Sequence, residues 1–187
     1  QIVPSEFSLS AGKKVKFRVF ALDSSGRRIK QLGDGLTWEK WIPPSAKFRA
    51  ELDGNLTMVG PGSLHALPSA KLSAGAIQVS YEGLTAVTRG RILPALPYRE
   101  DFQDGYTLNQ VASDGISFSY PPLPWLGARM RWQVQDLGGE RVAGNTLDRV
   151  LFQRAINFVG SWKDSDYIVE MDAMVDGNRR IKSTIGV

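Results

Sequence analysis

The sequence predicts an all-β protein that consists of two successive units. Apolar and polar residues alternate with a period of two in short runs, as expected of half-buried strands. Gly, Pro, Asp and Ser bound these runs, and no window carries a long apolar stripe of helical period with a cap at each end. The proline-rich residues 93–98 interrupt the alternation near the middle of the 187 residues. We therefore assign residues 1–95 to one unit and residues 96–187 to another.

The first unit contains several predicted strands at the spacing typical of a β-sandwich. They are residues 14–22, 36–40, 47–52, 76–81 and 84–92. In the first strand three cations alternate with three apolar side chains: Lys14, Lys16 and Arg18 with Val15, Phe17 and Val19. This alternation indicates a strand with one wet face and one buried face. Residues 23–26 (Asp-Ser-Ser-Gly) and Glu82-Gly83 predict the turns that follow the first strand and close the last hairpin.

The second unit resumes the alternation. Its predicted strands are residues 99–102, 116–120, 130–135, 150–158 and 167–175. In the third of them one face would hold Met130, Trp132 and Val134, and the other Arg131, Gln133 and Gln135. We therefore predict that Trp132 belongs to the core, and the same argument applies to Trp38 in the first unit.

The composition excludes several classes of protein. The chain contains no cysteine, so neither a disulfide nor a thiolate ligand or nucleophile can form. No stretch approaches the roughly 20 apolar residues of a membrane helix. The net charge is +4, but the cations occupy the wet face of a strand, where no aromatic side chains interleave with them, and we predict no nucleic-acid binding. Residues 1–4 lack the features of a secretion signal, which we expect to lie upstream in a longer protein.

A set of short motifs in the first unit resembles a known family. They are Val3-Pro4, Gly12 before the first long strand, the Asp-x-x-Gly turn of residues 23–26, Trp38, and Ala74-Gly75 before a late strand. Through these motifs residues 1–93 resemble the bacterial immunoglobulin-like (Big) family. The resemblance implies an immunoglobulin-like β-sandwich.

The second unit resembles the early strands of concanavalin-A-like, laminin-G-like jelly rolls in residues 98–102 and 162–172. Residues 120–129, 151–155 and 176–180 are similar to the C-terminal region of planctomycete-type PQQ-binding-like β-propeller repeat proteins. This resemblance implies a partial jelly roll within a bacterial envelope, periplasmic or extracellular protein. It also implies that the propeller, with any quinone site, lies upstream, so we predict no cofactor for these residues.

One motif suggests catalysis. The period of two places Glu170 and Asp172 on one face of a predicted strand, as in glucanases of the laminarinase type. Retaining hydrolysis needs a further carboxylic acid, but Met174 and Val175 occupy the positions where it would stand. A glycoside hydrolase is therefore the least favoured alternative, and we assign no catalytic residue.

Metal binding finds little support in the sequence. Asp101, Asp104 and Asp114 could supply oxygen ligands to a structural calcium, but their spacing is not that of an EF-hand loop. His65 is the single histidine and lies in the Gly- and Pro-rich residues 60–68, where we expect an exposed loop. We predict no metal site.

Aromatic side chains of the second unit are the candidate ligand contacts. They are Trp125, Tyr120 and Trp162. Exposed rings of this kind stack on sugars in lectin-like folds, whereas Trp125, after three prolines, is also a candidate plug over the end of a sandwich.

We predict a non-catalytic binding or assembly module of a bacterial envelope protein, with a carbohydrate-binding module as the alternative. The second unit supplies fewer strands than the about eight of a closed jelly roll. We therefore expect unpaired sheet edges that another protein segment completes. A glycan is the alternative partner.

Overall fold

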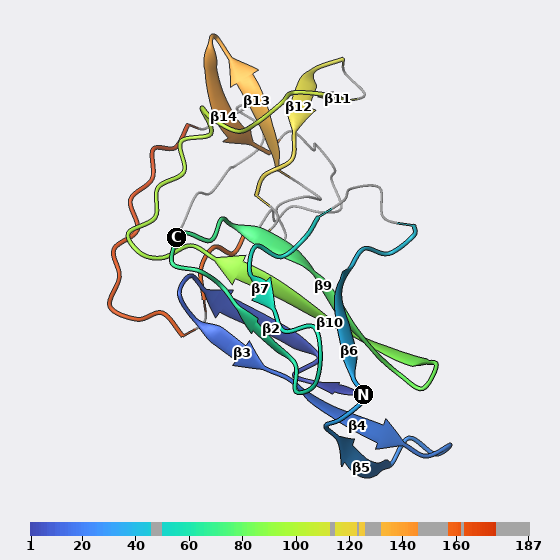
Figure 1. The fold of residues 1–187 in the computed structure, drawn as a ribbon. Coiled ribbons are helices and arrows are strands. Elements are labelled where there is room, and N and C mark those ends of the chain that lie inside the picture. The colour runs from blue at the N-terminus through green and yellow to red at the C-terminus, as the bar shows by residue number, and fades with distance from the viewer. Residues whose placement is uncertain are drawn as a thin grey trace.

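The computed structural model describes residues 1–45, 50–112, 115–122, 124–125, 132–145, 157–161 and 163–174. Strands are the regular elements throughout these residues, which confirms the all-β prediction (Figure 1). No helix in the described residues is long and apolar enough to cross a membrane. Most of the regular structure lies before Leu93, and strands resume at Gln110.

A four-stranded sheet forms one layer of the first unit. It contains β2 (Glu6–Ser10), β10 (Leu84–Leu93), β9 (Ser73–Tyr81) and β6 (Thr37–Trp41), in that order. β2 runs parallel to β10, and the other neighbours are antiparallel. The predicted hairpin at Glu82-Gly83 is confirmed: both residues have positive φ, 46° and 80°, as required by the tight turn that fits twisted strands.

Two smaller sheets pack against it. One has the order β1 (Ile2–Val3), β4 (Arg18–Leu22), β5 (Arg28–Leu32), and the other β3 (Lys14–Lys16), β8 (Ser63–His65), β7 (Asn55–Leu56). The predicted strand 14–22 is thus divided at Phe17, whose N–H donates to the Gly62 carbonyl at 2.9 Å. Its alternation is confirmed, because the cations are exposed whereas Phe17 and Val19 are buried.

The predicted turn after that strand depends on one carboxylate. Asp23 Oδ1 accepts hydrogen bonds from the Ser25 hydroxyl at 2.7 Å and from the N–H groups of Ser25 and Arg27, both at 2.9 Å. These bonds, that of the hydroxyl first, lower the pKa of the Asp23 carboxyl below its ordinary value. Gly26 follows with φ 81°.

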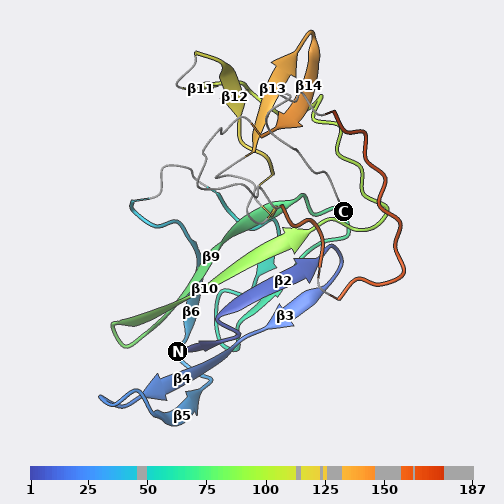
Figure 2. The same cartoon turned by 180° about the vertical axis from the view of Figure 1, so that it is seen from behind.

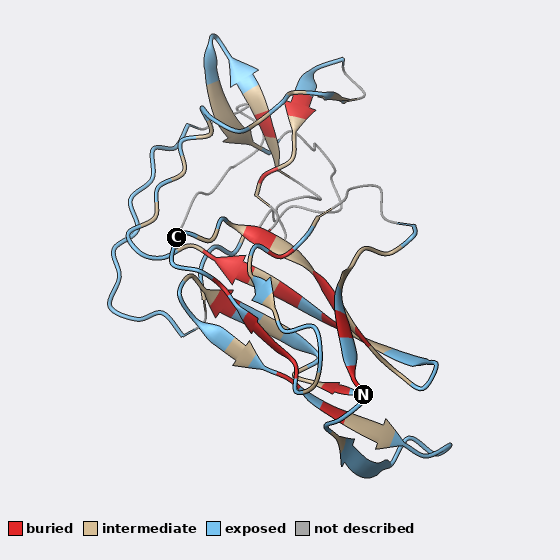
Figure 3. Ribbon diagram, viewed as in Figure 1, coloured by how far each residue is buried: buried red, intermediate tan, exposed pale blue. Residues whose placement is uncertain are grey.

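The core of the first unit lies between these layers (Figure 3). Its largest aromatic, Trp38, is 2% exposed, as predicted. The Trp38 ring stacks on Phe17 at a centroid distance of 5.4 Å, and its indole N–H donates to the Gly60 carbonyl at 2.9 Å. A Cβ at Gly62 would overlap the same ring, so only glycine fits there.

A buried threonine attaches the N-terminal segment to this core. Thr88 of β10 is fully buried, and its hydroxyl lies 2.9 Å from the Pro4 carbonyl oxygen and 3.0 Å from that of Ser5. The Arg89 N–H also donates to the Ser5 carbonyl. The chain is therefore fixed where it passes from β1 to β2.

The second unit contains a four-stranded antiparallel sheet, which lies beyond the end of the first unit (Figure 2). Its strands follow in chain order: β11 (Gln110–Val111), β12 (Ser117–Ser119), β13 (Gln133–Leu137) and β14 (Glu140–Gly144). Val134 is fully buried, as its predicted face requires. Trp132 is only half-buried, because it lies just before β13 rather than within it.

Several other predicted strands need correction. Residues 99–102 form no strand, because local hydrogen bonds replace the ladder: the Glu100 carboxylate accepts from the Phe102 N–H at 3.0 Å, and Phe102 has φ 62°. Residues 50–52, 157–158 and 167–174 are also outside the strands. The remainder of the predicted strands 47–52, 150–158 and 167–175, together with residues 130–131, lies outside the described residues.

Candidate binding surfaces

The aromatic residues predicted as ligand contacts are engaged with other rings. Trp125 is half-buried and packs edge-on against Phe102, with centroids 5.6 Å apart. Tyr120 is half-buried as well and meets Phe118 at 5.4 Å in a T-shaped pair. Trp162 lies outside the described residues. The two described rings therefore stabilise the interior of the second unit.

A carboxylate organises the connection between the units. Glu100 accepts from the Tyr98 hydroxyl at 2.9 Å, and it interacts with the Tyr106 hydroxyl as well. Burial raises the pKa of both tyrosines, and the negative charge of Glu100 raises it further.

Tyr98, Glu100 and Tyr106 line a groove of about 560 Å³ between the two units. The first unit contributes residues that include Pro68, Lys71 and Pro94, and the second contributes Tyr98 and Asp104. The carboxylate and the phenols in it bind each other. This arrangement holds the connecting segment in place. The alternation of residue types did not predict it, because alternation records strand faces and not hydrogen bonds between neighbouring side chains such as Tyr98 and Glu100.

The residues considered for catalysis and metal binding are separated in the structure. Glu170 and Asp172 lie on exposed, irregular chain, so the shared strand face that suggested a carboxylate pair is not formed. His65 is exposed but belongs to strand β8 instead of a loop. Asp101 and Asp104 are exposed, Asp114 lies outside the described residues, and the described residues bring no three metal-binding side chains together.

Residues 163–174 form the first unusual surface. They run as an irregular chain, in orange to red in Figure 1, and every one of them is exposed. Five are large apolar residues: Tyr167, Ile168, Val169, Met171 and Met174, of which Ile168 is 89% exposed. Such a concentration of exposed apolar side chains is unusual for a folded chain.

The second surface is the outer face of the sheet β2-β10-β9-β6. The register places Trp41, Ala76, Arg89 and Glu6 in one row across its strands. We refer to these residues as the Trp41 row. Trp41 is half-buried and Arg89 is exposed, while Ala76 between them is 8% exposed because both neighbours are larger.

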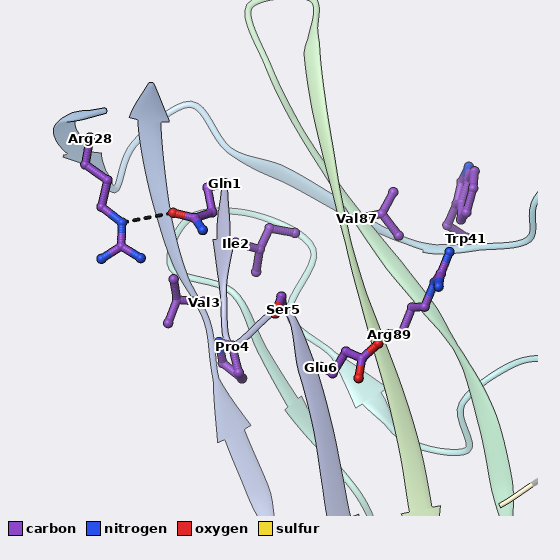
Figure 4. A pocket seen from close by; sticks show the side chains of 10 residues that line it. All are labelled: Gln1, Ile2, Val3, Pro4, Ser5, Glu6, Arg28, Trp41, Val87 and Arg89. Carbon is purple, nitrogen blue, oxygen red and sulfur yellow. Dashed lines mark hydrogen bonds between the residues drawn. The ribbon is translucent and has the colours of Figure 1, made fainter. Parts of the chain in front are cut away.

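A groove of about 640 Å³ adjoins the Trp41 row. Figure 4 shows its walls: Trp41, Val87 and Arg89 on one side, and the N-terminal residues with Arg28 on the other. Arg28 is held in place, since its Nε donates to Gln1 Oε1 at 2.9 Å and its guanidinium lies 4.5 Å from the Phe20 ring centre.

The sequence contains a signal for the outward position of Trp41. Trp38 and Trp41 are three positions apart on one strand, so they must point to opposite faces. Because Trp38 is in the core, Trp41 has to lie on the outer face.

No family model, curated protein or solved structure matches the chain.

Proposed function

We propose that the chain is a non-catalytic binding or assembly module of a bacterial cell-envelope protein, and that residues 163–174 are its assembly segment. The observation that carries the proposal is the exposure of five large apolar side chains in this segment. The occupant that we propose is the edge strand of another polypeptide, which would pair with the segment by β-strand addition.

The order of side chains in the segment favours a strand as the partner. In an extended conformation one face would carry Tyr167, Val169, Met171 and Ala173, and the other Ile168, Glu170, Asp172 and Met174. The first face is uninterrupted and apolar, and the second contains both carboxylates. This is the pattern of a strand that is buried on one side and wet on the other.

We also propose that residues 1–93 are an immunoglobulin-like module of the Big type. Its support is the strand order, because β1/β4 and β3-β8-β7 correspond to A, B, E and D of such a sandwich, and β6-β9-β10 correspond to C, F and G. β2 is an additional strand beside the last of these. The predicted Trp in the core strand and the Asp-x-x-Gly turn agree with this assignment.

For the second unit we propose the beginning of a jelly roll. The support is a four-stranded antiparallel sheet among the described residues, where a closed jelly roll has about eight strands in all. The envelope localisation and the association with a PQQ-like propeller protein belong to the same proposal and depend on the sequence resemblance.

Sedimentation velocity of the 187-residue chain over a wide concentration range tests the assembly segment. In the isolated chain a second copy supplies the partner strand, and we expect reversible self-association. Val169→Lys places a charge on the apolar face and should abolish it, whereas the matched change Ile168→Lys lies on the wet face and should leave it unaltered. A wild-type chain that stays monomeric throughout, or equal effects of the two variants, would contradict the proposal.

A further inference from the structure

We propose that the Trp41 row, together with its groove, binds a carboxylated saccharide. This site lies on the first unit and uses none of the residues of the assembly segment. It is therefore a second function, independent of the one proposed above. Three features carry it: an outward-facing indole, a guanidinium that forms no ion pair with the residues that the structure describes, and a groove of suitable size.

The indole provides a platform for a sugar ring. Trp41 lies on the outer face of a sheet, remains partly accessible, and has the small Ala76 beside it. Val87 extends the apolar surface from the next strand. A pyranose presents a face of C–H groups, which packs on an aromatic ring, while its hydroxyls at the rim stay in water. The partly accessible position of Trp41 on the sheet face fits such a ligand.

The guanidinium provides the charge recognition. Arg89 is exposed and forms no ion pair with the part of the chain that the structure describes. On the same strand face two residues further along, the Nε of Arg91 is buried without a hydrogen bond to any described group. A guanidinium binds a carboxylate through two parallel hydrogen bonds, which makes Arg89 the natural partner of a uronate.

The geometry matches the dimensions of this ligand. Two inter-strand spacings separate the backbones of Trp41 and Arg89, about 10 Å, so a ring stacked on Trp41 brings its carboxylate within reach of Arg89. The groove of about 640 Å³ is within the range of small-molecule sites. Its charged side chains are Arg28, Arg89 and Glu6, a net positive set.

The acids near the row do not cancel this charge. Glu39 accepts a hydrogen bond from Gln78 Nε2 at 2.8 Å and is thereby held at the β6 edge. The Trp41 row itself contains the acid Glu6, whose single negative charge is outnumbered by the two positive charges of Arg89 and Arg28. The Trp41 ring and the Arg89 guanidinium, which has no ion pair within the described residues, suit a single acidic ring better than an extended peptide or nucleic acid, which need repeated contacts.

Isothermal titration of the chain with an oligogalacturonide and with its methyl ester tests the proposal, because the ester retains the rings and removes the charge. We expect binding of the acid and weaker binding of the ester by about tenfold, the factor that a charge-assisted hydrogen bond supplies. Trp41→Ala should weaken both, while Trp41→Phe should preserve most of the affinity. Arg89→Gln should remove the preference for the acid over the ester.

Arg99→Gln, which removes an exposed arginine elsewhere, is the matched control and should change nothing. Val169→Lys should also leave saccharide binding intact, so that failure of the assembly proposal and failure of this one are distinguishable. Equal affinity for acid and ester, or an unchanged affinity of Trp41→Ala with a native circular dichroism spectrum, would overturn the proposal. Equally tight binding of a poly-glutamate peptide through the same residues would overturn the saccharide assignment.

Discussion

The side chain of Gln103 pairs with the backbone of Arg141 in the way that a neighbouring strand would. Gln103 Oε1 accepts from the Arg141 N–H at 3.2 Å, and Gln103 Nε2 donates to the Arg141 carbonyl at 2.9 Å. Arg141 Nη1 in turn donates to the Gln103 carbonyl at 2.7 Å. The connecting segment thus covers part of the β14 edge with one side chain, which protects that edge from pairing with other chains.

Replacement of Gln103 should therefore loosen β14. We expect Gln103→Ala to lower the free energy of unfolding by about 0.5–1.5 kcal/mol, since the lost hydrogen bonds are exposed to solvent. Urea denaturation measures this, and hydrogen exchange should show a faster Arg141 amide. Gln31→Ala, on the exposed strand β5, is the control and should have little effect. An unchanged exchange rate at Arg141 would show that the pairing contributes nothing.

Gly62→Ala should disrupt the core at Trp38. The added methyl group would overlap the indole ring, which stacking on Phe17 and the bond to Gly60 hold in place. Overpacking of this kind costs about 1–3 kcal/mol, measurable by thermal or urea denaturation. At Gly33 a Cβ would meet no atom within 4 Å, and Gly33→Ala should be nearly neutral. Similar stabilities of the two variants would contradict this account of the Trp38 packing.

Thr88→Val should release the segment between β1 and β2. Valine has nearly the same shape but cannot donate to the Pro4 or Ser5 carbonyl, and a loss of about 1–2 kcal/mol in unfolding free energy is expected. Amide exchange near residues 4–6 should accelerate in the same variant. Thr85→Val lies on an exposed position of the same strand and serves as the control. If both variants unfold alike, the hydroxyl does not fix the N-terminal segment.

Alkaline titration should show that Tyr98 and Tyr106 ionise above the ordinary range of tyrosine. Burial and the Glu100 charge raise the pKa of Tyr98 and Tyr106 in the folded state above the ordinary value of about 10. The unfolded chain therefore releases these protons first, so the contribution of these two tyrosines to stability is constant below about pH 10 and falls as the pH rises further. Ultraviolet absorbance should show that Glu100→Gln lowers both pKa values without restoring the ordinary one, since burial is the larger cause. Titration of both tyrosines near pH 10 in the wild type would refute the cluster.

Local pattern was sufficient where both faces of a strand have a fixed environment. The alternation from Lys14 to Val19 predicted which side chains are exposed to solvent. The same kind of alternation placed Trp38 in the core, where the structure has it. Glu82-Gly83 predicted a turn whose geometry depends only on those two residues. In these cases the information is contained in adjacent residues.

Pattern was insufficient where a strand depends on a partner. Residues 167–174 have strand-type composition, yet β-propensity describes packing against neighbours and cannot supply them. The Glu100 carboxylate accepts a hydrogen bond from the Phe102 N–H, which a strand would use for its own ladder. The alternation of residue types gives no sign of this competition. The Trp41 row combines four strands that are separated by up to about 80 positions in the chain, so its composition appears only in the folded sheet.

The parallel pairing of β2 with β10 also determines how the first unit carries load. When the chain is pulled apart by the segment before Glu6 and the segment after Leu93, the force acts along the two strands and across the hydrogen bonds between them. The five register pairs from Arg89–Glu6 to Leu93–Ser10 are then sheared together and cannot open one after another. A chain stretched between two attachments would therefore meet its mechanical resistance in this strand pair, on the sheet that also presents Trp41.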